Sequence, residues 1–177
     1  MAAFDFESLI TDIPDHPEPG VVFKDITTLL KDPDGFAAVI DSIADHFADR
    51  GITKVVGAEA RGFMIGAPVA YRLHAGFVPA RKPGKLPRET FSQSYDLEYG
   101  TDSLEIHVDA LPPDDVVLIV DDLTATGGTA AATARLIERI GAKVEGFGFL
   151  LELGFLHPRE TFAKACDAEV FSLVHVR

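Results

Sequence analysis

Short apolar runs alternate with helical patterns over the last two thirds of the chain, and this alternation constrains the fold more than any other feature. Strands are predicted at 54–57, 77–80, 116–120, 144–151 and 170–176, and helices at 63–74 and 128–140. Buried strands separated by helices are typical of an α/β fold, with a mostly parallel sheet flanked by helices. Ligands of such sheets bind beyond the carboxyl ends of the strands, so the residues that follow those strands are the candidates for chemistry.

Three further segments complete the predicted architecture of one domain over residues 1–177. An amphipathic helix is predicted from Phe6 to Ile13, before irregular chain at 14–34 that holds four prolines. Asp32 is the predicted N-cap of a second helix, which carries an apolar stripe from Phe36 to Phe47 and ends near Gly51. Residues 81–100 are predicted to form a long exposed loop, and 104–108 a half-buried strand.

Composition narrows the possible partners and location. The chain has 28 acidic and 16 basic residues and a formal charge of −12, which argues against binding to nucleic acid or to an anionic membrane. A single cysteine, Cys166, allows no internal disulfide, and the first residues carry acid where a signal peptide would carry base. We therefore expect a cytoplasmic protein. The six histidines show no metal-ligand spacing.

The segment 116–129 contains the strongest functional signal in the chain. A buried strand is followed by Asp121 and Asp122, and then by a turn of hydroxyl and glycine residues that opens a helix. Three hydroxyls, flexible glycines and the free N–H groups of a helix N-terminus can bind an anion without a lysine. The segment matches neither a Walker A loop nor a dinucleotide-binding glycine pattern.

The two adjacent aspartates suggest what that anion is attached to. Carboxylates beside a phosphate site would repel a polyphosphate laid across them, but they suit the hydroxyls of a vicinal diol or a bridging Mg²⁺. A diol next to a phosphomonoester describes ribose 5-phosphate. Adjacent acids after a strand also occur in receiver domains and Mg²⁺-dependent phosphatases, and a Thr/Gly turn can be a simple helix cap, so the residues alone leave these alternatives open.

Residues 116–129 closely resemble the phosphoribosyl pyrophosphate (PRPP) signature of the type I phosphoribosyltransferases. The resemblance implies that Asp121 and Asp122 hold the ribose hydroxyls. It implies that the turn Ala125, Thr126, Gly127, Gly128 and Thr129 wraps the 5′-phosphate. It also implies a Mg²⁺ ion held mainly by PRPP and water, with Asp121 and Asp122 as its protein contacts if it has any.

One further segment is similar to the adenine branch of that family. Residues 20–27 read Gly-Val-Val-Phe-Lys-Asp-Ile-Thr and resemble its base-binding segment, in a small N-terminal hood of about residues 1–34. The resemblance implies that Val22, Phe23 and Leu153 line an adenine site. Lys24 stands where many members have Arg, and a lysine cannot replace the planar fork of that side chain.

Two more segments resemble the pyrophosphate-binding parts of the family. Residues 57–63 read Gly-Ala-Glu-Ala-Arg-Gly-Phe, at a turn between a strand and a helix, where free N–H groups and Arg61 could hold an anion. The second segment, residues 81–85, reads Arg-Lys-Pro-Gly-Lys. The resemblance implies pyrophosphate contacts from Ala60, Arg61, Arg81, Lys82 and Lys85, with Arg61 also catalytic.

Residues 95–100, Tyr-Asp-Leu-Glu-Tyr-Gly, resemble the end of the family's mobile catalytic loop, here about 82–100. That match implies Glu98 as the acid/base and Tyr99 as a loop residue near the substrates. The resemblance spans about residues 4–176 and implies transfer of phosphoribose to adenine, giving AMP in purine salvage, by a homodimer. Preference for another base, or a regulator that senses PRPP without catalysis, are the alternatives. The acidic charge argues against the regulator, which would need a nucleic-acid-binding surface.

Overall fold

A five-stranded parallel sheet forms the centre of the protein. The computed structural model describes residues 4–96 and 100–177. The strand order is β4-β3-β7-β8-β9, and every neighbouring pair is parallel. The strands are β3 (Lys54–Ala58), β4 (Gly76–Ala80), β7 (Val116–Thr124), β8 (Lys143–Leu153) and β9 (Glu169–Val176). The predicted α/β class with a mostly parallel sheet is confirmed.

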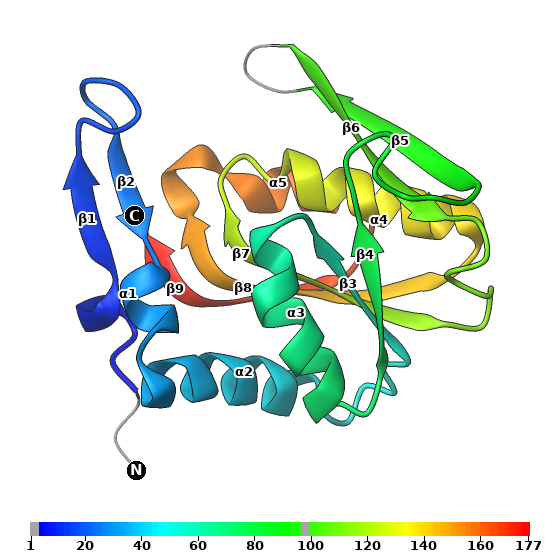
Figure 1. The fold of residues 1–177 in the computed structure, drawn as a ribbon, viewed down its shortest axis with the longest axis horizontal. Coiled ribbons are helices and arrows are strands. Elements are labelled where there is room, and N and C mark those ends of the chain that lie inside the picture. The colour runs from blue at the N-terminus through cyan, green and yellow to red at the C-terminus, as the bar shows by residue number, and fades with distance from the viewer. Residues whose placement is uncertain (1–3, 97–99) are drawn as a thin grey trace.

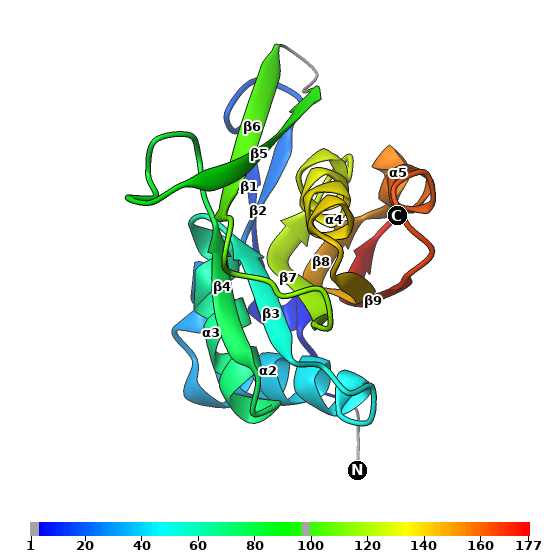
Figure 2. The ribbon, with the colours of Figure 1, turned by 90° about the vertical axis from the view of Figure 1, so that its right-hand side faces the viewer.

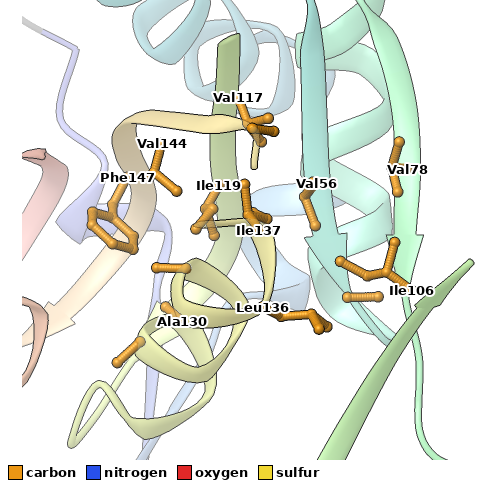
Figure 3. Close-up of a cluster of buried hydrophobic side chains, with 14 of the residues drawn as sticks. Val56, Val78, Ile106, Val117, Ile119, Ala130, Leu136, Ile137, Val144 and Phe147 are labelled. Carbon is orange, nitrogen blue, oxygen red and sulfur yellow. The ribbon is translucent and has the colours of Figure 1, made fainter. Parts of the chain in front are cut away.

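Helices cover both faces of this sheet (Figures 1 and 2). Helices α2 (Pro33–Phe47) and α3 (Arg61–Arg72) lie on one face, and α4 (Gly128–Ile140) and the short α5 (Pro158–Ala163) on the other. Figure 3 shows the core under α4, where Ile137 of the helix lies beside Ile119 of β7 and Leu136 points toward Ile106. Because β7 is buried on both faces, its sequence is continuously apolar up to Val120. No helix in the described ranges is long and apolar enough to cross a membrane.

The start of α2 follows the sequence prediction. Asp32 has extended backbone geometry, and its side chain accepts a hydrogen bond of 2.7 Å from the N–H of Gly35, while Pro33 occupies the first helical position. The apolar stripe of the helix is buried against the sheet, ending at Phe47. The chain then turns at Gly51, whose φ is +67°.

The predicted N-terminal helix is wrong. Residues 7–9 form one 3-10 turn, η1 (Glu7–Leu9), and the chain then extends as β1 (Thr11–Pro14), which pairs antiparallel with β2 (Val22–Asp25). Four side chains at helical spacing suggested a helix, but only the first three pack against the core. Pairing with β2 satisfies the backbone instead, and β2 and α1 (Thr27–Leu30) lie in chain that was predicted to be irregular.

The predicted loop at 81–100 is also wrong in part. Residues 90–96 form β5 (Thr90–Asp96), which pairs antiparallel with β6 (Thr101–His107) in register Thr90↔His107 to Asp96↔Thr101. The strand predicted at 104–108 from its alternating apolar and polar residues therefore has β5 as its partner. Sequence analysis missed β5 because residues 81–89, which precede it, have the composition of a loop. Both hairpins, β1–β2 and β5–β6, rise beyond the edge of the sheet where the parallel strands end (Figure 1).

Two glycines of β8 let α2 approach the sheet closely. A Cβ atom on Gly146 would lie 2.5 Å from Phe47 Cε1, and one on Gly148 would lie 2.9 Å from Ile43 Cγ2. Both Phe47 and Ile43 are fully buried, so neither can move into solvent. The contact between α2 and β8 therefore depends on the absence of side chains at these two positions.

We expect Gly146→Ala to destabilise the protein by about 1–3 kcal/mol, because the added methyl overpacks the Phe47 ring. Urea unfolding followed by circular dichroism measures the change. The control is the double variant Gly146→Ala/Phe47→Leu, in which the smaller leucine makes room for the methyl. Its loss in the free energy of unfolding should be smaller than the sum of the losses in the two single variants. Strict additivity would contradict the overpacking explanation.

Candidate active site

A pocket of about 310 Å³ opens at the carboxyl edge of the sheet, where sequence analysis placed the chemistry. It is enclosed by the turn after β7, by the junction of β3 and α3, and by the β5–β6 hairpin. The residues that line it are Glu59, Arg61, Lys82, Tyr95, Leu104, Phe149 and residues 121–130. The structure thus brings the predicted diol, phosphate-turn and two of the predicted pyrophosphate residues into one cavity.

The turn after β7 presents an uncapped helix N-terminus to this pocket. Gly127 is left-handed, with φ +82° and ψ −1°, and its carbonyl accepts the first hydrogen bond of α4, from the N–H of Ala131 at 2.9 Å. No described side chain caps the helix. The N–H groups of the first turn therefore point at the pocket without partners from within the helix, and the helix dipole favours an anion there.

Thr124 adds a hydroxyl that the sequence-based set of site residues left out. It is the last residue of β7, is only 3% exposed and lines the pocket. Its Oγ1 has no hydrogen-bond partner among the residues described. A buried hydroxyl normally finds a partner, so a ligand oxygen in the pocket is the natural one. The sequence signal was available, since Thr124 opens the run of hydroxyl residues.

Asp121 and Asp122 lie side by side near the end of β7. Asp122 is 3% exposed, and its Oδ2 lies 3.0 Å from Nε of Arg61, while its N–H donates to Oδ1 of Asp121 at 2.9 Å. Burial, and after it the charge of Asp122, raise the pKa of the Asp121 carboxyl well above its ordinary value, and Arg61 opposes this only weakly. The apo site therefore holds two carboxylates that repel each other in a poorly solvated place.

Close packing at α3 fixes the position of Asp121. A Cβ atom on Gly62 would lie 2.8 Å from Oδ1 of Asp121 and 3.2 Å from the carbonyl of Val120. Only glycine leaves room for the carboxylate between β7 and the first turn of α3. Glycine at this position is therefore part of the site, a role that was not predicted.

Arg61 begins α3 and links two sets of predicted residues. It belongs to the predicted pyrophosphate contacts, and it pairs with Asp122 of the predicted diol site. Its side chain is half exposed and lines the pocket, while Nε is paired with Asp122. Ala60, at the N-cap of α3, is exposed and is not in the pocket lining, and the Glu59–Ala60 peptide is cis.

The three predicted cations at 81–85 are placed differently from one another. Lys82 lines the pocket, and its ammonium contacts the Asp102 carboxylate and lies 5.9 Å from the centre of the Tyr95 ring. Arg81 lies outside the lining, and its Nε donates to Oε2 of Glu59 at 2.8 Å. Lys85 is exposed and also outside the lining. The structure therefore brings one of the three into the pocket.

The four predicted base-site residues are not among those that line this pocket. Val22, Phe23 and Lys24 lie in β2, and the ammonium of Lys24 donates to both carboxylate oxygens of Asp12 at 2.7 Å. Leu153 ends β8 and packs against the core on the α2 side. Lys24 instead lines a second cavity of about 370 Å³ between the hairpin and the end of β9. Glu98 and Tyr99 lie outside the described residues.

The carboxylates present suit a metal that arrives with a phosphate ligand. Within residues 4–96 and 100–177, no group of three or more His, Cys, Asp or Glu side chains could hold a metal ion. Asp121 and Asp122 provide a pair, and Mg²⁺ is commonly bound through one or two carboxylates together with substrate phosphates and water. The residues therefore fit a Mg²⁺ ion held largely by its substrate, and not a closed protein site.

Comparison with known proteins agrees with this geometry. The family model of the phosphoribosyl transferase domain matches residues 25–174. The adenine phosphoribosyltransferase of Desulfitobacterium hafniense is 55% identical over 98% of this chain and 99% of its own. The crystal structure of the Thermoanaerobacter pseudethanolicus adenine phosphoribosyltransferase superposes with a TM-score of 0.91 at 49% identity, covering 97% of this chain and 98% of the other.

A structure of the Saccharomyces cerevisiae adenine phosphoribosyltransferase, in complex with adenine and an imino-altritol bisphosphate, is 38% identical with a TM-score of 0.87 and covers 95% of this chain and 96% of the other. Sequence, fold and pocket lead to the same result: the chain belongs to the adenine phosphoribosyltransferase family of phosphoribosyltransferases.

Proposed function

We propose that this pocket transfers the 5-phosphoribosyl group of PRPP to adenine, giving AMP and pyrophosphate. The observation that carries the proposal is the pairing of two adjacent carboxylates, Asp122 buried and Asp121 partly buried, with an uncapped helix N-terminus in one cavity, which matches a ribose diol next to a phosphomonoester. In the reaction, a ring nitrogen of adenine attacks C1′ of the ribose, the bond from C1′ to the pyrophosphate oxygen breaks, and adenine loses one proton.

Asp121 and Asp122 accept hydrogen bonds from the ribose 2′- and 3′-hydroxyls in this proposal. The 5′-phosphate then lies against the turn of residues 125–129 and takes the hydroxyl of Thr124 as an additional donor. The raised pKa of Asp121 supports the assignment, because diol hydroxyls would replace the missing solvation of the carboxylate pair.

Arg61 and Lys82 are the proposed contacts of the pyrophosphate group, since both line the pocket. Their charges stabilise the negative charge that develops on the leaving group. Ala60, Arg81 and Lys85 stay candidates of the same kind, with Arg81 fixing Glu59 through their hydrogen bond. A Mg²⁺ ion bound to the PRPP oxygens would neutralise further charge on the departing pyrophosphate.

Adenine is proposed to bind near β2, where Val22 and Phe23 offer apolar surface, with Leu153 as an opposing wall. The ammonium of Lys24 is already bound to Asp12, so any contact from this residue to the base is better made by its backbone. Glu98 is the proposed group that takes the proton of the base, and Tyr99 a loop residue near it. Closure of this loop would keep water from the reactive C1′.

A homodimer is proposed as the working form, and the exposed face of α3 supports it. Met64 and Tyr71 lie seven residues apart on this helix and are 43% and 84% exposed. A second copy of the chain that packed on this face would remove both side chains from water. A cytoplasmic location stays part of the proposal, since the single cysteine needs no oxidising compartment.

The first test is a panel of bases incubated with the protein, PRPP and Mg²⁺, with nucleotide products separated by chromatography. We expect AMP from adenine and much slower conversion of guanine and hypoxanthine. Equal rates with all three purines would contradict the assignment of adenine, and absence of any nucleotide would favour a PRPP-binding regulator.

The second test replaces both aspartates, Asp121→Asn and Asp122→Asn. Loss of charge-assisted hydrogen bonds, each about 1.5–3 kcal/mol, should weaken PRPP binding about a hundredfold or more, as measured by titration calorimetry with Mg²⁺. Adenine binding should change far less. Unchanged PRPP affinity in the folded double variant would show that the diol site has been misplaced.

The single variant Asp121→Asn should also raise the melting temperature of the apo protein at neutral pH. Folding raises the pKa of the Asp121 carboxyl, so the folded state binds this proton more tightly than the unfolded state does. The free energy of unfolding therefore falls as the pH rises from the ordinary pKa of the unfolded state to the raised pKa of the folded state. Asparagine mimics the protonated form and avoids this loss. The gain should therefore disappear below about pH 4, where the wild-type carboxyl is protonated in both states.

The third test concerns Glu98→Gln, which keeps the size of the side chain and removes its acid/base function. General acid–base assistance contributes about 100- to 10,000-fold, so kcat should fall in that range while the affinity for PRPP changes little. Glu89→Gln, at the other end of the same segment, serves as the control and should retain its turnover. A Glu98→Gln variant with near-normal kcat would show that another group takes the proton.

A further inference from the structure

Glu152 is a buried carboxylate outside the proposed catalytic groups. It lies in β8 and is 3% exposed. Arg159 donates to it twice, from Nε to Oε1 at 2.8 Å and from Nη2 to Oε2 at 2.9 Å, and the Ser172 hydroxyl donates to Oε2 at 2.7 Å. Nδ1 of His175 lies 3.4 Å from the same oxygen. Both carboxylate oxygens of Glu152 therefore have hydrogen-bond partners, as a buried carboxylate requires.

This cluster joins three elements on the α4 side of the protein. Glu152 belongs to β8, Ser172 to β9 and Arg159 to α5 (Figure 2). Helix α5 has six residues, too few for a helix that is stable by itself, so its position depends on tertiary contacts. Besides Arg159, Phe162 holds it, stacking on Phe147 with ring centres 4.7 Å apart.

Helix α5 in turn lies directly behind the phosphate turn. A Cβ atom on Gly127 would lie 2.9 Å from Cε1 of Phe162, 3.0 Å from the carbonyl of Pro158 and 3.2 Å from Cβ of Thr161. Gly127 is the left-handed residue that sets the direction of the first N–H groups of α4. A shift of α5 toward the turn would collide with Gly127, and a shift away would leave the turn unsupported.

We propose that Arg159, anchored by Glu152 and Ser172, is a positioning residue for the 5′-phosphate: it fixes α5 behind Gly127 and so holds the phosphate turn in its binding geometry. The proposal rests on the assignment of that turn to the 5′-phosphate. It assigns no contact between Arg159 and substrate, because Arg159 is outside the residues that line the pocket. Its effect therefore falls on ligands that carry the phosphate and spares those that lack it.

Titration calorimetry of Arg159→Met with AMP and with adenosine tests this selectivity. AMP and adenosine differ only in the 5′-phosphate, so the ratio of their affinities reports on the turn. Misplacement of binding groups by about 1 Å costs on the order of a hundredfold, and we expect the AMP affinity to fall about ten- to a hundredfold. The adenosine affinity should stay within about twofold, a difference below 0.5 kcal/mol.

Arg50→Met is the matched control, because it breaks an ion pair to β9, the strand that carries Ser172. Arg50 Nη2 lies 2.6 Å from Oε2 of Glu169, the first residue of β9, three residues before Ser172 and six before His175. This variant loses an arginine–carboxylate pair of similar kind without touching α5, and the ratio of AMP to adenosine affinity should stay at the wild-type value. An equal loss in both variants would mean that general loosening of β9, and not α5, controls the turn.

Hydrogen exchange of the backbone amides of α4 gives a second readout that does not depend on ligand identity. Those at 131–133 are the informative ones, because the Ala131 amide donates to the Gly127 carbonyl; in the apo Arg159→Met protein they should exchange faster, while those of β3 stay unchanged. Should Arg159→Met fail to fold, Ser172→Ala removes one hydrogen bond to Glu152 and keeps the ion pair, with an expected loss of AMP affinity of about threefold.

The results separate the two proposals. A folded variant with wild-type exchange at 131–133 and a wild-type AMP-to-adenosine ratio overturns the positioning role. Wild-type protein that binds AMP no better than adenosine overturns the assignment of the phosphate site itself, and exchange at the turn then decides alone whether Arg159 holds it in place.

Discussion

The crowding of two adjacent carboxylates at the end of the central strand, one buried and one partly buried, is the constraint around which the site is organised. Asp122 is nearly inaccessible and Asp121 has a raised pKa, so the apo protein holds charge that it neither solvates nor fully neutralises. Within residues 4–96 and 100–177, Arg61 supplies the one ion pair of this couple, and the missing side chain of Gly62 leaves the space for Asp121. Folding tolerates this cost because the rest of β7 is an apolar strand buried on both faces. A ligand with a diol offsets it on binding.

Close approach between elements depends on glycine at several places in this molecule, and three of them illustrate its role. Gly62 admits the Asp121 carboxylate to the first turn of α3, Gly127 brings α5 against the phosphate turn, and Gly146 lets Phe47 of α2 lie on β8. The first two positions belong to the site and the third to the core. The positions of the Asp121 carboxylate and of the phosphate turn are therefore set by the same kind of tight packing that stabilises the core.

The central sheet and the polar segment after β7 could be predicted from sequence because their signals are local. An apolar strand, two acids and a glycine turn before a helix need no distant partner to be recognised. The two hairpins were missed because strand pairing is a long-range choice: β1 was taken for a helix, and β5 for loop, until β2 and β6 supplied partners. Pairings such as Arg81 with Glu59, or Lys24 with Asp12, likewise have no local signature and change the expected roles of two predicted cations.

These differences divide the proposed site into a fixed part and a peripheral part. The diol and phosphate groups stand on β7 and α4, backed by the core and by α5, whose half-exposed Arg159 pairs with the buried Glu152. The proposed base residues Val22, Phe23 and Lys24 stand on the β1–β2 hairpin, which, like β5–β6, rises from the sheet edge (Figure 1). Each hairpin is a two-stranded sheet, which is weakly stable by itself and depends on what it packs against. The sugar phosphate thus meets a preorganised surface, whereas the base meets elements whose position can respond to it.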